Sequence, residues 1–346
     1  MRVEDISLEW IKGIGPKSNI ALSSRIRLAR NLRDYPFPSV AKRKDLEGVV
    51  EKVKGVLEQD PYFKGFSLFM LESLSKVERE TLVEKHLISP EHANGGARKA
   101  GAVLIEHEGV LSVMINEEDH LRIQCFLGGL QLGEVWRIID RFDSILEKYV
   151  DYAFDEEFGY LTACPTNVGT GLRASVMLHL PGLVMTKKIG KVVEELSKIG
   201  LTVRGIYGEG TEALGNLFQL SNQVTLGPSE EEIIDKLEKI ALRVIEEEEL
   251  SRKQLFKVKG IRLEDSLWRA YGILKNARIM SSKEAMELLS QVRMGVDMGI
   301  LPSIDKRKFN ELLISIRPAH LQLSAKRELA PEERDKMRAD LLRESF

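Results

Sequence analysis

The chain has little of what several protein classes require. It holds only two cysteines, Cys125 and Cys164, and six histidines in 346 residues. Two cysteines are too few for a disulfide framework or a structural zinc site, and the histidines lack metal-ligand spacing. No apolar run approaches the length of a membrane span, and the N-terminus lacks the apolar centre of a signal peptide. The sequence therefore predicts a cytoplasmic protein with reduced thiols and no membrane association.

An excess of charge of either sign is also missing. The formal net charge of −2 at pH 7 gives no overall field toward nucleic acid or an anionic lipid surface, so we expect no direct nucleic-acid partner. A hydrophobic content of 43% with 30% charged residues is typical of a globular protein. The length is too great for one typical core and suits two domains.

The first part of the chain mixes strand and helix patterns. "GAVLIEHEGVLSVMIN" (101–116) predicts a hairpin, and "EVWRIIDRFDSILEKYV" has the apolar spacing of a helix. "RASVMLHL" (173–180) alternates in character and stops at Pro181, which predicts a strand. Such a mixture favours an α+β domain, an antiparallel sheet flanked by helices, which we assign to residues 1–255.

From Ser229 the pattern changes to helices alone. Ser229 is a typical N-cap residue before a long amphipathic segment that reaches residue 256. After Gly260 the segments "EDSLWRAYGILKNA", "SSKEAMELLSQVRMGV" and "APEERDKMRADLLRE" all have helical patterns. We therefore expect an all-α C-terminal domain over residues 256–346.

A glycine-rich segment, "CPTNVGTGLRASV" (164–176), interrupts the first domain. Its residues 169–174 fit the dinucleotide fingerprint GxGxxG/A, which requires a helix directly after the glycines. Here the predicted strand follows instead, so the nicotinamide interpretation fails. The Walker A lysine is missing, as are the glycine loop and the HRD and DFG elements of protein kinases.

Five arginines lie on segments with strand character. In "SSRIRLAR" two arginines alternate with apolar residues, and "NEEDHLRIQC" places Glu118, His120 and Arg122 on one face in the same way. Guanidinium groups on a sheet face are costly unless they meet solvent or an anion, and they bind phosphate oxygens through two hydrogen bonds. For any one of them a solvated face is the simpler interpretation, but five beside glycine turns predict a phosphate site. They are Arg25, Arg27, Arg122, Arg173 and Arg204.

The ordered segments "SSRIRLARNL", "NEEDHLRI", "CPTNVGTGLRASV" and "RGIYGEGTEA" resemble the catalytic domain of the phosphagen (ATP:guanido) kinases, the family of creatine and arginine kinases. The resemblance implies that ATP is the cofactor and that Mg²⁺ is held mainly by ATP, without a metal site of the protein. It also implies that Glu118 and Glu209 hold a guanidinium beside Cys164. The residues implied to bind ATP are Ser24, Arg25, Arg27, His86, Arg122, Arg173, Ser175, Met177, Arg204, Gly205 and Gly208.

The chemistry of a guanidinium supports this assignment independently. A guanidinium is a cation and a poor nucleophile, so phosphoryl transfer requires one proton to be removed and one nitrogen to be aimed at the γ-phosphorus. Glu118 is the first choice for the base, and Glu209 lies on a glycine-rich segment typical of a closing lid. The Thr166 hydroxyl is placed to lower the pKa of the Cys164 thiol. Which carboxylate dominates, and whether Glu212 takes part, stay open.

Two departures separate the chain from kinases of small guanidino compounds. Only 22 residues precede Ser23, where those kinases carry a helical domain, so we expect a more open site. The all-α C-terminal domain with "RDKMRA" (334–339) resembles the bacterial protein-arginine kinases, which use an RDxxRA motif to bind phosphoarginine. That resemblance implies an allosteric phosphoarginine site at Arg334, Asp335 and Arg338.

The same resemblance implies a set of partners. These are protein substrates that bear arginine, an activator protein, a heat-shock repressor that is inactivated, an AAA+ unfoldase of a protease, and a second copy of the chain in a homodimer or larger assembly. Two alternatives remain at this point. One is a phosphagen kinase for a free guanidino compound, and the other is a catalytically dead adaptor that binds phosphoarginine.

Overall fold

An eight-stranded antiparallel sheet forms the centre of the protein. The computed structural model describes residues 2–96, 100–207 and 213–346. The strands follow the order β2-β3-β4-β5-β1-β8-β10-β9, and a separate two-stranded sheet pairs β6 with β7. Their bounds are β1 Ala21–Arg30, β2 Phe66–Met70, β3 Ala102–Glu106, β4 Leu111–Ile115, β5 Leu121–Gly128, β6 Phe154–Asp155, β7 Gly159–Tyr160, β8 Leu172–His179, β9 Leu201–Tyr207 and β10 Ala213–Asn222.

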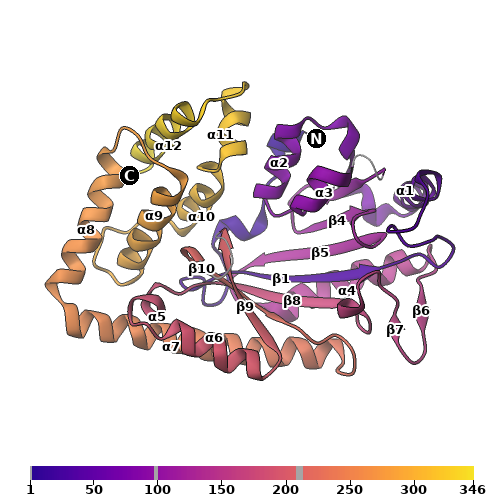
Figure 1. Ribbon diagram of the computed structural model, residues 1–346, viewed down its shortest axis with the longest axis horizontal. Coiled ribbons are helices and arrows are strands. Elements are labelled where there is room, and N and C mark those ends of the chain that lie inside the picture. Colours follow the sequence, from indigo (N-terminus) through magenta and orange to yellow (C-terminus); the bar gives the residue numbers. More distant parts are fainter. Residues whose placement is uncertain (1, 97–99, 208–212) are drawn as a thin grey trace.

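Helices surround this sheet and then continue alone toward the C-terminus (Figure 1). The helices before the C-terminal region are α1 Arg43–Gln59, α2 Lys76–Glu84, α3 Pro90–Gly95, α4 Leu132–Glu147, α5 Pro181–Met185 and α6 Ile189–Lys198. They are followed by α7 Glu230–Lys259, α8 Ile261–Asn276, α9 Ser282–Asp297, α10 Lys306–Ser315, α11 Pro318–Ala325 and α12 Pro331–Ser345. Short 3-10 helices lie at Val3–Asp5, Glu9–Lys12, Pro61–Gly65, Leu71–Ser73 and Pro165–Asn167.

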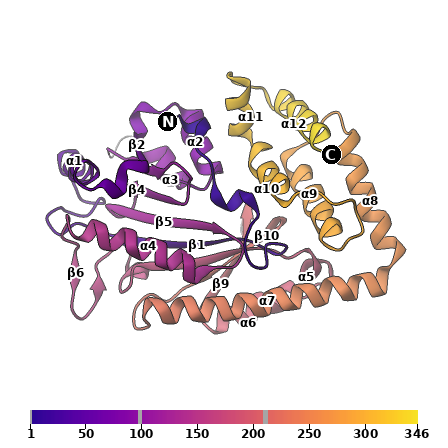
Figure 2. The same ribbon diagram turned by 180° about the vertical axis from the view of Figure 1, so that it is seen from behind.

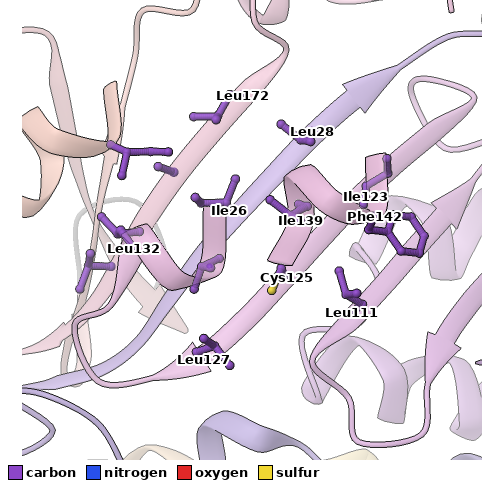
Figure 3. Packing of buried hydrophobic residues seen from close by; sticks show 14 of the residues in the cluster. Ile26, Leu28, Leu111, Ile123, Cys125, Leu127, Leu132, Ile139, Phe142 and Leu172 are labelled. Carbon is purple, nitrogen blue, oxygen red and sulfur yellow. The ribbon is translucent and has the colours of Figure 1, made fainter. Parts of the chain in front are cut away.

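Helices α4 and α7 cover one face of the sheet. In β1 the side chains of Ile26 and Leu28 point to this face, and Figure 3 shows them packed with Ile139 and Phe142 of α4. Each of these four side chains is fully buried, which contributes about 1.5–3 kcal/mol per residue. Because successive strand residues face opposite sides, Arg25 and Arg27, which alternate with these two residues in β1, point to the other face.

The predicted fold class is confirmed, as are most of the predicted elements. The hairpin at residues 101–116 is the antiparallel pair of β3 and β4. Helix α7 begins where the sequence predicts, because the Ser229 hydroxyl accepts a hydrogen bond from the Glu232 amide, as in a capping box. Strand β8 ends at His179, two residues before Pro181 begins α5.

One local prediction is wrong. Glu118 and His120 do not share a strand face with Arg122, because β5 begins only at Leu121 and both residues lie in the turn after β4. The His120 ring is buried and bonded to the backbone, with Nδ1 3.1 Å from the Leu32 amide nitrogen. The left-handed conformation of Asn116 (φ +62°) turns the chain out of β4 before the alternation can resume.

Helices α8 to α12 pack around a second hydrophobic cluster beside the end of the sheet (Figure 1). Helix α7 ends at Lys259, and Gly260 with φ +45° lets α8 start in a new direction. Helix α11 lies against α2, as both views show (Figures 1 and 2). Over the described ranges, no helix has the length and apolar character to cross a membrane.

Candidate active site

The five predicted arginines all lie on strands of the central sheet. Arg27 of β1 pairs with Arg173 of β8 on one side and with Gln124 of β5 on the other. Arg122 lies two residues from Gln124, and Arg204 of β9 pairs with Gln219 of β10. Since the side chains alternate along each strand, this register directs the charged groups to the sheet face that α4 and α7 leave open.

The arginines are close enough to perturb one another. Burial lowers the pKa of Arg27 well below its usual value, and the positive charges of Arg25, Arg122 and Arg173 lower it further. Burial and the charges of Arg204 and Arg122 likewise lower the pKa of Arg173. In the part of the chain that the structure describes, the buried Nε atoms of Arg27 and Arg173 have no hydrogen-bond partner. Half-buried guanidinium groups with a buried and unbonded Nε favour a bound anion.

Three of these arginines line a cavity of about 460 Å³ together with His86. They are Arg25, Arg27 and Arg122. The left-handed His86 (φ +61°) follows α2 and turns its ring into the cavity lining. Burial lowers the pKa of His86 to about 3, helped by the charge of Arg25 and that of Arg317, so the ring is neutral near pH 7.

Arg25 is held in place by neighbouring strands. Its Nη2 donates to Gln219 Oε1 at 2.8 Å and its Nε donates to Ser175 Oγ at 3.3 Å. The guanidinium carbon also stands 5.0 Å from the centre of the Phe126 ring, in range of a cation–π contact. The sheet therefore fixes the direction of this cation before any ligand arrives.

A second cavity of about 560 Å³ adjoins the first, and Arg122 lines both. Glu117, Glu118 and Ala163 also line the second cavity. Burial and the charge of Asp119 raise the pKa of Glu118, while Arg122 and a hydrogen bond from Cys164 lower it in part. The Cys164 thiol also lies 3.0 Å from the Thr166 hydroxyl, so carboxylate, thiol and hydroxyl form a chain at the cavity edge.

Two acidic neighbours of Glu118 anchor this arrangement, and the sequence analysis missed both. Glu117 accepts hydrogen bonds from Ser89 Oγ at 2.7 Å, from the Glu118 amide at 3.0 Å and from Arg122 Nη1 at 2.9 Å. Asp119 Oδ1 accepts from the Ala163 amide at 2.7 Å, which ties the cysteine segment to the same turn. The run of three acids before His120 was the available signal.

Other predicted site residues lie elsewhere. The buried Ser24 hydroxyl donates to the Gly129 carbonyl and accepts from the Gln131 amide. Met177 packs in the second hydrophobic cluster, and Gly205 continues β9 beside Arg204. Two predicted residues, Gly208 and Glu209, lie outside the described residues, as does Glu212.

The glycines of "CPTNVGTGLRASV" are explained by contacts within the chain. A Cβ atom on Gly169 (φ +108°) would stand 2.3 Å from the Thr225 carbonyl oxygen. A Cβ atom on Gly171 (φ +65°) would stand 2.6 Å from the Ala29 carbonyl oxygen. Both glycines therefore let this segment approach neighbouring backbone and enter β8 with Arg173 at the open face.

The predicted phosphoarginine motif lies on α12. Arg338 is fully buried, where its Nε donates to the Ile316 carbonyl and its Nη1 to the Met280 carbonyl, each at 2.8 Å. Its Nη1 also contacts Asp335 Oδ1 at 2.5 Å. Arg334 is only half-buried and donates to the Leu329 carbonyl at 2.8 Å. Arg338 therefore has a structural role in the motif, while Arg334 and Asp335 keep contact with solvent.

Metal-ligating groups do not gather anywhere in residues 2–96, 100–207 and 213–346. Within these ranges no three side chains of histidine, cysteine, aspartate or glutamate stand together as they would around an ion. The residues that line the two cavities offer cations to an anion and a carboxylate to a proton donor.

Comparisons with known proteins agree with this geometry. Residues 48–251 match the family model "ATP:guanido phosphotransferase, C-terminal catalytic domain", and residues 260–346 match "Protein-arginine kinase McsB C-terminal domain". The chain is 51% identical to a protein-arginine kinase of Moorella thermoacetica, covering 97% of this chain and 96% of that protein. It is also 51% identical to one of Pelotomaculum thermopropionicum, covering 99% and 97%. A crystal structure of lombricine kinase shares the fold, with a TM-score of 0.59 and 24% identity over 74% of this chain and 71% of that one.

Proposed function

The chain belongs to the ATP:guanido phosphotransferase family and, within it, to the protein-arginine kinases, and from this premise we propose that it transfers the γ-phosphate of ATP to arginine side chains of proteins. The observation that supports this most is the pair of adjoining cavities that share Arg122. One is rich in cations, and the other presents the carboxylate of Glu118. A polyanion and a guanidinium placed in these two cavities would meet at Arg122.

In this proposal the cationic cavity takes the phosphates of ATP. Arg25, Arg27 and Arg122 lie on its wall, and Arg173 and Arg204 extend the positive surface along the open face. The buried, unpaired Nε atoms of Arg27 and Arg173 fit such a ligand, because phosphate oxygens would complete their hydrogen bonding. Mg²⁺ would arrive bound to the phosphates and would offset part of their charge.

The second cavity takes the arginine of the substrate protein. Glu118 accepts a proton from the guanidinium as one of its nitrogens forms the bond to the γ-phosphorus, and the bond from that phosphorus to the ADP oxygen breaks. The raised pKa of Glu118 suits a base that must hold this proton and then release it. Cys164 contacts the same carboxylate, and we place it beside the bound guanidinium. Glu209 completes the clamp in this proposal, by resemblance to the family.

The remaining roles are proposed from family membership. Arg334, Asp335 and Arg338 form the phosphoarginine site that couples activity to phosphorylation, with Arg338 holding the helices and Arg334 meeting the phosphate. The modification marks proteins for an AAA+ protease and inactivates a heat-shock repressor, and an activator protein and self-assembly regulate the enzyme. The specific claim is that the phosphate acceptor is an arginine side chain of a protein and not free arginine.

The experiment compares acceptors. The purified protein is incubated with ATP and Mg²⁺ and with either free arginine or an unfolded protein, and acid-labile phosphate on arginine is located by mass spectrometry at neutral pH. We expect phosphoarginine in the protein. Phosphate confined to the free amino acid would identify a phosphagen kinase instead. No transfer to either, with retained phosphoarginine binding, would identify an adaptor.

A further inference from the structure

The cationic cavity receives one arginine that does not come from the sheet. Arg317, from the loop between α10 and α11 in the C-terminal domain, lines the same cavity as Arg25, Arg27 and His86. The positive charge of Arg317 also lowers the pKa of His86, which places its guanidinium near that ring. The C-terminal domain therefore forms part of the wall of a cavity that otherwise belongs to the first domain.

Contacts on both sides hold Arg317 in this position. Directly after it, the N-terminus of α11 is bound by Glu84 of α2, whose two carboxylate oxygens accept from the Ala319 and His320 amides at 2.8 and 2.9 Å. The His320 ring lies 2.7 Å from the same carboxylate. Glu84 is two residues from His86, so one short segment carries both the carboxylate that binds the start of α11 and the imidazole ring that lines the cavity.

The residue directly before Arg317 is fixed from within the C-terminal domain. The buried Arg338 donates to the Ile316 carbonyl at 2.8 Å, and the Arg317 amide donates to the Ile314 carbonyl at 2.9 Å. Arg317 is also the N-cap residue of α11, and its backbone is extended (φ −75°, ψ 152°). It lies between the bonded Ile316 carbonyl on one side and the bonded amides at the start of α11 on the other. A long side chain on such a rigid base loses little entropy when it binds a ligand.

We propose that Arg317 is a phosphate-binding residue of the nucleotide site, so that the C-terminal domain contributes a cation of its own to ATP binding. This inference rests on the proposed function, because it requires ATP in the cationic cavity. The charge of Arg317 fits a polyanion and not the incoming arginine, which is itself a cation. Arg317 lines the cationic cavity and is absent from the lining of the cavity that contains Glu118.

Two acidic residues line the cavity near this position. Glu84 lines the cavity too, but its carboxylate is occupied by two backbone amides and the His320 ring. Glu91 also lines the cavity and is exposed at the surface of α3. The cavity wall thus carries four arginines, of which Arg122 is paired with Glu117, against these two lining acids, and this balance favours an anionic ligand.

The test measures nucleotide affinity in the full-length protein. Equilibrium constants for Mg·ATP and for inorganic tripolyphosphate are determined by calorimetry for the unchanged protein, for Arg317→Gln and for the control Arg327→Gln. Arg327 follows the same helix, is exposed, and pairs with Glu333 rather than lining the cavity. Loss of one charge-assisted hydrogen bond weakens binding on the order of 10-fold, so we expect that loss for both ligands in Arg317→Gln and none in Arg327→Gln.

Each other outcome has a defined meaning. If the unchanged protein binds ATP and Arg317→Gln binds it equally well, this inference is wrong and the proposed function stands. If the unchanged protein does not bind ATP, the proposed function fails and this inference with it. Weaker ATP binding with unchanged tripolyphosphate binding would place Arg317 at the nucleoside and overturn the phosphate assignment. Should Arg317→Gln fail to fold, Arg317→Lys replaces it, because lysine keeps the charge without the planar fork. We then expect a loss of affinity for both ligands that is measurable but smaller than about 10-fold.

Discussion

Glu117 and Arg122 form an ion pair at the wall between the two cavities, with Glu117 Oε2 2.9 Å from Arg122 Nη1. The same carboxylate oxygen accepts the Glu118 amide, and the other oxygen accepts the Ser89 hydroxyl. Glu117 is nearly buried, so its charge is compensated by these donors rather than by water. One side chain therefore orients both Arg122 of the cationic cavity and the backbone of Glu118, the base in our proposal.

The first prediction concerns this positioning residue. Glu117→Gln keeps the size of the side chain, but an amide cannot accept hydrogen bonds at both ends. We expect kcat to fall about 10-fold and KM for ATP to rise several-fold, because Arg122 and Glu118 both lose their support. Steady-state kinetics check this, with Glu134→Gln as the control at an exposed pair with Arg137. An unchanged kcat in Glu117→Gln would show that the pair has no effect on the site.

The second prediction concerns Glu118 as the base. Its pKa lies above the ordinary value of 4.5, first because of burial and then because of Asp119. A base must be ionised, so kcat should fall as the pH falls through this raised pKa, with the midpoint above 4.5. Glu118→Gln should lower kcat by a factor on the order of 10² to 10⁴ and abolish this limb of the profile.

The control for Glu118 is Glu108→Gln, since Glu108 is an exposed acid in the hairpin turn between β3 and β4. It should leave the pH profile unchanged. ATP affinity should also persist in Glu118→Gln, because Glu118 lines the other cavity. Full activity of Glu118→Gln at every pH would refute its assignment as the base.

The sequence predicted the arginine face because strand alternation has a period of two residues. Arg25 and Arg27 alternate with buried apolar residues, and the same reasoning applies to Arg173 in β8. The resemblance to phosphagen kinases then predicted which sheet and which ligand these side chains share. The local pattern was sufficient to place these side chains on one face of the sheet, while the ligand that they share stays a prediction.

Other parts could not be read from a single sequence. The turn after β4 breaks the alternation through a left-handed asparagine, so Glu118 was placed on a strand although it lies in a turn. Glu117 acts through an ion pair with a residue five positions away, which no periodicity reveals. Arg317 reaches the cavity from the loop between α10 and α11, far along the chain, and the packing of α11 on α2 brings it there.

The third prediction contrasts the two cysteines. Cys125 is fully buried and burial raises the pKa of its thiol well above the usual value, so it should not react with a thiol reagent in the folded protein. Cys164 is partly exposed and contacts Glu118, which lines the second cavity. We expect iodoacetamide to modify Cys164 alone, as peptide mass mapping would show, and Cys164→Ser to remove all labelling. Labelling of Cys125 at a comparable rate would contradict the buried position of β5.

The fourth prediction concerns Lys85, whose ammonium group fixes the N-terminal segment. Its Nζ donates to the Val3 carbonyl at 3.0 Å and to the Ile6 carbonyl at 2.8 Å. Lys85→Met leaves these carbonyls without a donor and should lower the free energy of unfolding by about 1–3 kcal/mol. Urea denaturation measures this cost, and hydrogen exchange should show loss of protection near residues 3–6. Lys76→Met, at an exposed site on α2, is the matched control and should cost less than about 0.5 kcal/mol.

The last prediction separates two arginines of the RDKMRA motif. Arg338 is buried and donates to two carbonyls from other parts of the C-terminal domain, so Arg338→Ala should lower the free energy of unfolding by about 3 kcal/mol. Arg334 is half-buried with one carbonyl partner, so Arg334→Ala should cost only about 1 kcal/mol. If Arg334 meets the phosphate of a bound phosphoarginine, Arg334→Ala should nevertheless reduce calorimetric affinity for a phosphoarginine peptide about 10-fold or more. A variant with unchanged affinity would show that the motif only holds α12 against α8 and α11.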